Sequence, residues 1–312
     1  MRKCVLTVVL IVMVAIFTSV SAEGFNRSVL EEAGLQIEDV YIHIPGITHT
    51  YHFLWLSDLH IVIDNEEIAE DQHEFVKGRQ TSWAIRSDGK QAGDWWVEGL
   101  AGTINSSSPD AIFFGGDMLD LCTEATVNML KQGLEKITVP WIYIRADHDY
   151  ETHWLREPDL DKNLQMQSAI CDYEGTVILE YQEFIIIGIN NSTSVMSDEA
   201  VEQAKAVTDK GKPIIVLTHV PYNSLVDTTL DETSRLTWQD RNLSWGDGTS
   251  YTPNEIMSEW MEKVYEEDSP VVEVLAGHLH YSWDGMISET VHEHVFGAGF
   301  SGYVGLITVD GE

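Results

Sequence analysis

Acidic and histidine side chains follow several apolar runs of this 312-residue chain, at the point where each run ends. They are Asp58 and His60 after 51–56, Asp117 after 111–114, Asp147 and His148 after 141–144, His219 after 213–217, and His278 and His280 after 271–275. Carboxylate and imidazole groups without thiolate favour ions such as Mn, Fe or Zn. Two such ions about 3.5–4 Å apart can hold the oxygens of a phosphoryl group and activate a bound water. These residue types therefore indicate metal-dependent chemistry on a phosphate ester.

The spacing of these side chains suggests how they meet. Two run ends carry a pair spaced two residues apart, Asp58 with His60 and His278 with His280. In an extended chain such residues point to the same side, so each pair is expected to reach one centre. A central carboxylate such as Asp117 can bridge two ions. Ligands of open α/β sheets gather beyond the carboxyl ends of the strands, where we expect the five run ends to converge.

The elements that position these residues are visible as continuous apolar runs, which are typical of strands buried on both faces. The runs are 51–56, 111–114, 141–144, 184–189, 213–217, 271–275 and 303–309. Helical spacing or capping residues mark 124–137, 197–208 and 254–266. Strands that alternate with helices predict an α/β fold with much parallel pairing. No repeat or linker divides residues 23–312, so we expect one domain.

Two long polar segments, 63–103 and 221–253, do not fit this alternation and are predicted to be insertions. Their tryptophans are expected mainly to pack the insertions onto the body of the domain. The arginines Arg79 and Arg86 of the first segment, and Arg145 before the third run end, are alternative phosphate contacts. Surface salt bridging is the commoner role for such residues.

The ordered set of motifs resembles the calcineurin-like metallophosphoesterase superfamily. The pattern of that family is DxH, GD, GN followed by His or Glu, a single His, and GHxH. The resemblance extends over residues 50–310 and rests on all five motifs in order, because each motif alone is weak. It implies a four-layer α/β/β/α sandwich of two mixed sheets. It also implies hydrolysis of phosphate monoesters or diesters with two divalent or trivalent ions, Mn, Fe or Zn.

The resemblance also implies a role for each matching residue. The metal ligands would be Asp58, His60 and His280 on the first ion, Asp147, His219 and His278 on the second, and Asp117 as the bridge. His148 would lie near the leaving group, as a proton donor or as a phosphate ligand. The nucleophile would be a metal-bound hydroxide.

The third motif departs from the family pattern, because Ala146 and Asp147 stand where Gly and Asn are usual. Asp147 keeps an oxygen ligand and adds a negative charge, which is expected to tighten the second metal and lower its Lewis acidity. An alternative function is therefore a metal-binding scaffold or ligand-binding module with weakened catalysis. The ten tryptophans suggest a third reading, a carbohydrate-binding surface protein without metal dependence.

The N-terminus predicts export. Arg2 and Lys3 precede an apolar run, and small residues lead to Ala22, as in a cleaved signal peptide over residues 1–22. An uncleaved membrane anchor is the alternative, although the run is short for a span. We expect a secreted, cell-surface or periplasmic protein with no membrane span after cleavage.

The net charge of the chain restricts which substrates and partners are expected. The first 22 residues hold two of the 18 basic and none of the 51 acidic residues, so the mature chain carries about −35. Such a surface disfavours polymeric nucleic acid, which leaves a phosphorylated small molecule or another phosphoester as substrate. The sequence leaves the oligomeric state open.

Two smaller questions have alternatives. Cys122 and Cys171 can form a disulfide or remain two buried thiols. His292 and His294 repeat the His-x-His spacing, and they either touch the metal site or occupy plain strand positions.

Overall fold

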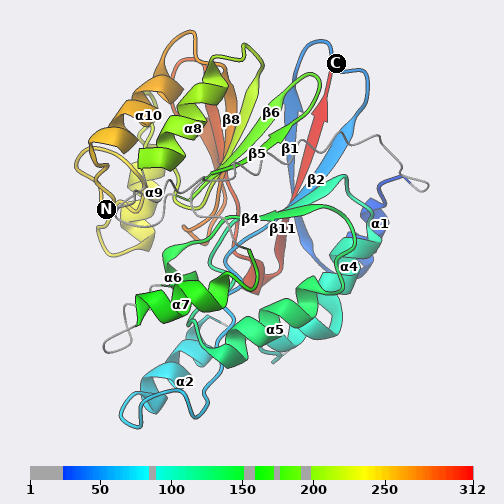
Figure 1. Ribbon diagram of the computed structural model, residues 1–312, viewed down its shortest axis with the longest axis vertical. Coiled ribbons are helices and arrows are strands. Elements are labelled where there is room, and N and C mark those ends of the chain that lie inside the picture. Colours follow the sequence, from blue (N-terminus) through cyan, green and yellow to red (C-terminus); the bar gives the residue numbers. More distant parts are fainter. Residues whose placement is uncertain (1–23, 84–88, 151–158, 172–175, 191–197, 312) are drawn as a thin grey trace, which may run out of the picture.

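The computed structural model describes residues 24–83, 89–150, 159–171, 176–190 and 198–311, and two β-sheets lie at its centre (Figure 1). The first sheet has the order β1-β11-β2-β3-β4 and the second the order β5-β6-β7-β8-β10-β9. The strands of the first sheet are β1 (Gln36–His43), β2 (Tyr51–Leu56), β3 (Ala111–Phe114), β4 (Trp141–Tyr143) and β11 (Tyr303–Asp310). Those of the second are β5 (Thr176–Glu180), β6 (Ile185–Ile189), β7 (Ile214–Thr218), β8 (Val271–Ala276), β9 (Trp283–Met286) and β10 (His292–Val295).

Both sheets are mixed. Strand β2 pairs in parallel with β3, and β3 with β4, so the three strands end at the same edge of the first sheet. In the second sheet β6, β7 and β8 are likewise parallel neighbours. The antiparallel pairs are β2 with β11, β5 with β6, and β9 with β10. The parallel strands thus deliver the residues that follow them to neighbouring sheet edges.

The apolar runs are continuous because each strand packs on two sides. In β2, Phe53 and Trp55 face the second sheet, whereas Leu54 and Leu56 face the helices. Strand β6 shows the same alternation, with Ile186 between the sheets and Ile187 toward the other helices. A β-strand alternates its side chains, so a strand between two apolar layers needs apolar residues at every position.

Helices cover the outer face of each sheet (Figure 1). On the first sheet they are α1 (Arg27–Glu32), α2 (His73–Ser82), α3 (Ala92–Trp95), a π-helix (Trp96–Leu100), α4 (Ala101–Ser106), α5 (Glu124–Leu134), α6 (Asp147–Tyr150) and α7 (Leu160–Gln167). On the second they are α8 (Asp198–Thr208), α9 (Thr229–Thr237) and α10 (Glu255–Tyr265), and a 3₁₀ turn (Gly299–Ser301) precedes β11. The predicted four-layer α/β/β/α sandwich is therefore confirmed.

Local sequence fixes where the main helices begin. Thr123 caps α5, because its hydroxyl accepts a hydrogen bond from the Thr126 amide at 3.2 Å. Asn254 caps α10 in the same way, with its side-chain oxygen 2.8 Å from the Met257 amide. The predicted capped start of the helix at 197–208 involves Ser197, which lies outside the described residues.

The seven predicted strands are present, each within one residue at either end, but four strands were not predicted. The strands that the sequence did not predict are β1, β5, β9 and β10. Strand β1 alternates exposed and buried residues near its end, β5 is half-buried throughout, and β9 and β10 carry charged side chains. None of them forms a continuous apolar run, which is the signal that revealed the others.

The two segments predicted as insertions contain their own helices. Segment 63–103 holds α2, α3 and the π-helix, where Trp96 is fully buried and donates its indole N–H to the Leu130 carbonyl of α5. Segment 221–253 holds α9 and the buried Trp245. These two tryptophans pack against the body, whereas Trp83 and Trp238 lie beside the site described below.

Three further predictions concern the signal peptide, membrane spans and the cysteines. The predicted signal peptide and Arg86 lie outside the described residues. Within the part of the chain that the structure covers, every helix is too short or too polar to cross a bilayer. Cys122 and Cys171 are both buried and are not joined by a disulfide, so the thiol alternative holds.

Candidate metal centre

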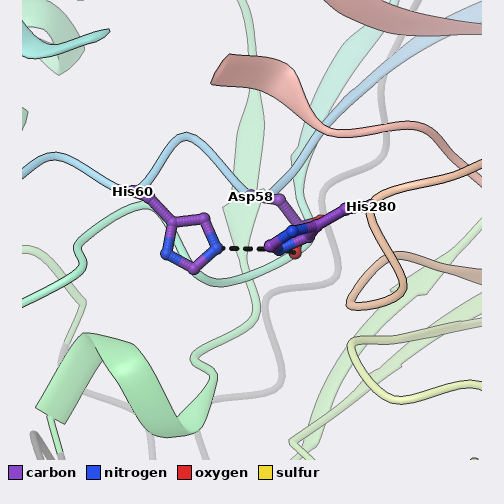
Figure 2. A group of neighbouring side chains, drawn as sticks. All are labelled: Asp58, His60 and His280. Carbon is purple, nitrogen blue, oxygen red and sulfur yellow. Dashed lines mark hydrogen bonds and ion pairs between the residues drawn. The ribbon is translucent and has the colours of Figure 1, made fainter. Parts of the chain in front are cut away.

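Loops that follow β2 and β8 bring together Asp58, His60 and His280. The Nε2 atoms of the two imidazoles are 3.0 Å apart, and the His280 Nε2 atom lies 3.4 Å from an Asp58 carboxylate oxygen. Figure 2 shows the two rings pointing at each other with the carboxylate beside His280. Ligands about 2.0–2.2 Å from one ion lie about 3 Å from each other, so this geometry suits an ion. The three side chains form a group that could hold a metal.

A second group lies next to the first and consists of Asp117, His219 and His278. The Asp117 carboxylate is 3.2 Å from the His219 Nε2 atom, which is also 3.2 Å from the His278 Nδ1 atom. All three side chains are buried. This group also has the residue types and the separation of metal ligands.

Asp117 lies between the two groups. The same carboxylate oxygen that approaches His219 is 3.7 Å from the Nε2 atom of His60. A single carboxylate within reach of ligands from both groups is the arrangement that a bridging ligand requires. The two candidate ion positions are therefore adjacent, as in a dinuclear site.

His148 and Asp147 follow β4 and lie at the edge of this cluster. His148 forms a further group with His60 and Asp117, and its ring packs edge-on against His60 with centroids 4.7 Å apart. Asp147 is buried, and its charge raises the pKa of both Asp117 and His219, which places it beside the second group. Among the described residues, the groups with metal-ligand separations do not include Asp147.

Two of the imidazoles are oriented by partners on their far side. The Nδ1 atom of His60 lies 3.0 Å from an Asp120 carboxylate oxygen, and the Nδ1 atom of His219 lies 2.7 Å from the Gly115 carbonyl. Each Nδ1 therefore donates its proton away from the cluster, and each Nε2 faces the cluster, where it offers a lone pair once the ring is neutral. Metal-binding histidines are usually oriented in this way.

The backbone at the cluster adopts a conformation that side chains rarely allow. The described chain has eight non-glycine residues with positive φ, and five of these are predicted ligands: Asp58 (53°), His60 (48°), Asp117 (50°), His278 (71°) and His280 (60°). Left-handed backbone is uncommon for such residues and is concentrated at functional sites.

This backbone corrects one expectation. The pairs spaced two residues apart were expected to be extended and to share a centre, but their residues are left-handed. Asp58 and His60 still meet in one group, whereas His278 and His280 contribute to different groups. Both pairs have left-handed backbone in place of extended chain, so the two-residue spacing does not decide whether a pair shares one group.

Two glycines of the motifs are required by close approach. A Cβ atom on Gly277 would lie 2.5 Å from the Ser57 hydroxyl and 2.6 Å from an Asp58 carboxylate oxygen. Gly116 has φ +91°, and a Cβ atom there would lie 2.9 Å from the His219 ring. Only glycine leaves room for the ligands at these positions.

Three buried polar atoms of the cluster, within the described part of the chain, have no hydrogen-bond partner: Asp117 Oδ1, His278 Nε2 and His280 Nδ1. Buried polar groups are almost always paired, and an unpaired one costs about 1–3 kcal/mol. Unpaired atoms on predicted ligands are consistent with a bound ion and its coordinated solvent. The residues present therefore fit a metal centre.

The protonation of the cluster reflects its crowded charges. Burial raises the pKa of Asp117 well above its usual range, and the neighbouring carboxylates Asp147 and Asp58 add to this. Burial alone would lower the pKa of His219, but the charge and hydrogen bond of Asp117 outweigh burial and raise it to about 10. Without ions, protons compensate the negative charge, and bound cations would take their place.

Two carboxylates that support the cluster were not predicted. Asp120 is fully buried and accepts from His60 and from the His148 Nδ1 atom, 3.1 Å away, as well as from Arg79. Asp149 accepts from the backbone amides of Asp117 and Ala146, and so ties two of the motif loops together. Each lies two or three residues after a predicted ligand, and that proximity was the only signal in the sequence.

The other candidate residues are not members of the metal-ligand groups described above. Arg79 binds Asp120, whose position behind His60 places the guanidinium beside the cluster, and Arg145 is buried. His292 and His294 are in β10, where His292 pairs with Glu273 and Asp284. The described metal-ligand groups do not contain either histidine.

Comparison with known proteins gave a family match over most of the chain. The model of the calcineurin-like phosphoesterase family matches residues 51–282. None of the curated protein sequences is significantly similar to this one.

Solved structures with a similar fold include a dimetal phosphatase from Danio rerio, with a TM-score of 0.47 and 10% identity over 80% of this chain and 87% of that chain. The purple acid phosphatase PPD1 from yellow lupin (Lupinus luteus) has a TM-score of 0.46 and 14% identity over 80% of this chain and 44% of its own. The phosphopantetheinyl hydrolase from Mycobacterium tuberculosis has a TM-score of 0.41 and 14% identity, over 79% of this chain and 89% of its own.

Proposed function

The chain belongs to the calcineurin-like phosphoesterase family, and we propose that it hydrolyses phosphate monoesters or diesters at a dinuclear metal centre. The observation that carries the proposal is the position of Asp117, within 3.7 Å of His60 and 3.2 Å of His219. Asp58, His60 and His280 would hold one ion, and the ligands of the other would come from the loops after β4, β7 and β8. Mn, Fe and Zn all suit these donors.

When bound, the two ions would supply Lewis acidity toward the phosphoryl oxygens and a lower pKa for coordinated water. The protein's own part is to hold seven side chains in place and to balance their charge. Asp120 and the Gly115 carbonyl fix the rings of His60 and His219, so both present Nε2 to the cluster. Preorganised ligands of this kind need no rearrangement during the reaction.

His148 is the candidate proton donor to the leaving oxygen. Burial lowers the pKa of His148 well below its usual range, so the ring gives up a proton readily. The Asp120 carboxylate, 3.1 Å from Nδ1, opposes this shift and directs Nε2 away from Asp120. The ring also packs on His60, so it lies at the edge of the cluster and not within the ligand set of one ion. A group in this place can give its proton to an alcohol as the phosphorus–oxygen bond breaks.

The test is metal-dependent release of nitrophenol from p-nitrophenyl phosphate and from bis(p-nitrophenyl) phosphate. The chain would be loaded with Mn²⁺ or Zn²⁺ and compared with a chelated sample, with His278→Ala and with the control His292→Ala. We expect turnover that chelation and His278→Ala abolish, while His292→Ala, remote from the cluster, keeps it. Two bound ions without turnover would favour the scaffold alternative and point to Asp147. Absence of bound metal would overturn the proposal.

We also propose that the protein is exported, because of the basic start and apolar run before Ala22. N-terminal sequencing of the protein from its native source is expected to begin at Glu23. A chain that keeps its first 22 residues in the membrane fraction would instead identify an anchor.

A further inference from the structure

Two tryptophans from the two long polar segments meet beside His280. Trp83 follows the last residue of α2, and Trp238 follows the last residue of α9. Their ring centroids are 6.1 Å apart, and they lie 5.2 Å and 5.3 Å from the His280 ring. Segments far apart in the sequence thus place a continuous aromatic surface at the first group of predicted ligands.

Contacts to the motif loops hold this surface in place. The Trp238 indole N–H donates to the carbonyl of Leu279, the residue between the two histidines of the last motif, at 3.1 Å. Phe300 supports Trp83 from the side, with ring centroids 6.0 Å apart, and also packs 5.2 Å from the His280 ring. Both tryptophans are only half-buried, so part of each ring faces solvent.

The charged side chain described beside these rings, Arg79, is bound to Asp120. The Arg79 guanidinium stacks 5.4 Å from the Trp83 ring centroid, and its Nε atom donates to Asp120 at 2.9 Å. Among the described residues, the rings that pack against His280 on this side are those of Trp83, Trp238 and Phe300, so this part of the surface is aromatic. An indole face binds another planar ring well, because stacking requires no particular pattern of hydrogen bonds.

We propose that Trp83 and Trp238 bind a planar aromatic group of the substrate, so that the preferred substrate is a phosphoester carrying a heterocyclic or aryl ring. This inference rests on the proposed phosphoesterase function and specifies its substrate class. A nucleoside phosphate has the required chemistry, with a phosphate for the ions and a base for the indoles.

The test compares adenosine 5′-monophosphate with ribose 5-phosphate. The leaving oxygen is the ribose 5′-oxygen in both, so only the base differs. We expect kcat/KM to be about ten-fold higher for the nucleotide, which is within the range of one stacked base. Trp238→Leu should reduce this ratio to below about two. The ratio compares two substrates in one variant, so a loss of turnover common to both, from the broken contact to Leu279, cancels. Trp238→Phe, which keeps a ring, should retain most of the preference.

Control variants and measurements distinguish loss of the aromatic surface from damage to the fold. Trp141→Leu replaces another half-buried tryptophan, in β4, and should keep the ten-fold ratio. Metal content and Tm of each variant show whether the centre is intact. Adenosine should inhibit the unmodified protein competitively and ribose should not, which tests the same surface without a mutation. If only diesters are hydrolysed, thymidine 5′-(p-nitrophenyl) phosphate and ethyl p-nitrophenyl phosphate form the equivalent pair.

The outcomes are distinct. Absence of turnover with every phosphoester and both metals would overturn the proposed function. Equal turnover of the matched substrates would overturn the aromatic preference alone. A preference that survives in both Trp238→Leu and Trp83→Leu would place the ring elsewhere and also refute the inference.

Discussion

Replacing Asp120 by Asn would show whether one buried carboxylate organises the whole cluster. Its oxygens accept from the Nδ1 atoms of His60 and His148, at 3.0 Å and 3.1 Å, and from two nitrogens of Arg79. An Asn side chain of the same shape has one acceptor oxygen, and its NH₂ group would face donors. The two imidazoles share the Oδ1 atom, whereas the Arg79 Nε atom binds Oδ2, so either both imidazoles or Arg79 Nε lose their acceptor. The negative charge behind His60 and His148 is lost in either case.

The size of the effect follows from these contacts. Loss of the carboxylate behind a metal-binding histidine typically lowers metal affinity about 10–100-fold. Removing one partner of a buried charged pair costs about 3–5 kcal/mol of folding free energy, here because Arg79 loses its counter-charge. With saturating metal, the disturbed His148 should lower kcat by about a further 100-fold, the lower end for a general acid.

The assay is competition of Zn²⁺ between the protein and a chromophoric chelator, followed by turnover at saturating metal. Glu273→Gln is the matched control, because Glu273 accepts from His292 Nδ1 at 2.8 Å in the same way but on β8, outside the metal-ligand groups described. It should change stability and leave metal affinity unchanged. Metal affinity within two-fold of the unmodified protein in Asp120→Asn would refute the argument that this carboxylate orients His60.

Three further predictions concern packing, proton release and pH. Gly277→Ala should displace Asp58 and lower metal affinity at least ten-fold by the same chelator assay, whereas Gly102→Ala in α4, where a Cβ atom meets nothing within 4 Å, should raise stability by about 0.5–1 kcal/mol in urea melts. Asp117 and His219 both have a raised pKa in the metal-free chain, and this pair must give up its protons to bind an ion, so calorimetry at pH 7 in two buffers should detect proton release on metal binding; no release would contradict this. Burial raises the pKa of Glu38 to about 7 from 4.5, so the folded state holds the proton more tightly and the free energy of unfolding falls as pH rises between these values. Glu38→Gln should lose less stability between pH 5 and pH 8, by about 1 kcal/mol after allowance for solvent screening, and identical pH profiles of the two proteins would rule this out.

The part of the fold that the sequence predicted is the part with two-sided burial. Strands β2, β3 and β7 lie between two apolar layers, so all their residues except His52 and Thr218 are apolar, and a predicted ligand follows each strand within three residues. Strand β1 could not be found in this way, because its alternating exposed positions and charged side chains weaken the pattern. Burial on both faces thus explains both the successes and the omissions.

The sequence motifs predicted the residues of the candidate site that would bind metal directly. Its supporting residues were not, because nothing in the local sequence marks a side chain that acts through another. Asp120 is recognisable only when His60 and His148 are seen on either side of it. Trp83 and Trp238 are separated by more than half of the mature chain, and tertiary packing alone brings their rings together.

The conformation of the ligands connects these observations. Asp58, His60, Asp117, His278 and His280 share a left-handed backbone. Each such residue costs about 1–3 kcal/mol, and the chain does not use glycine to relieve the cost. Three of them, Asp117, His278 and His280, also carry unpaired buried atoms. Strain and unsatisfied polar groups that coincide on one set of residues violate the local rules that the rest of the fold obeys, and such violations mark functional sites. Cations held by this cluster would offset these costs in part, so the stability of the chain should depend on the occupancy of its metal centre.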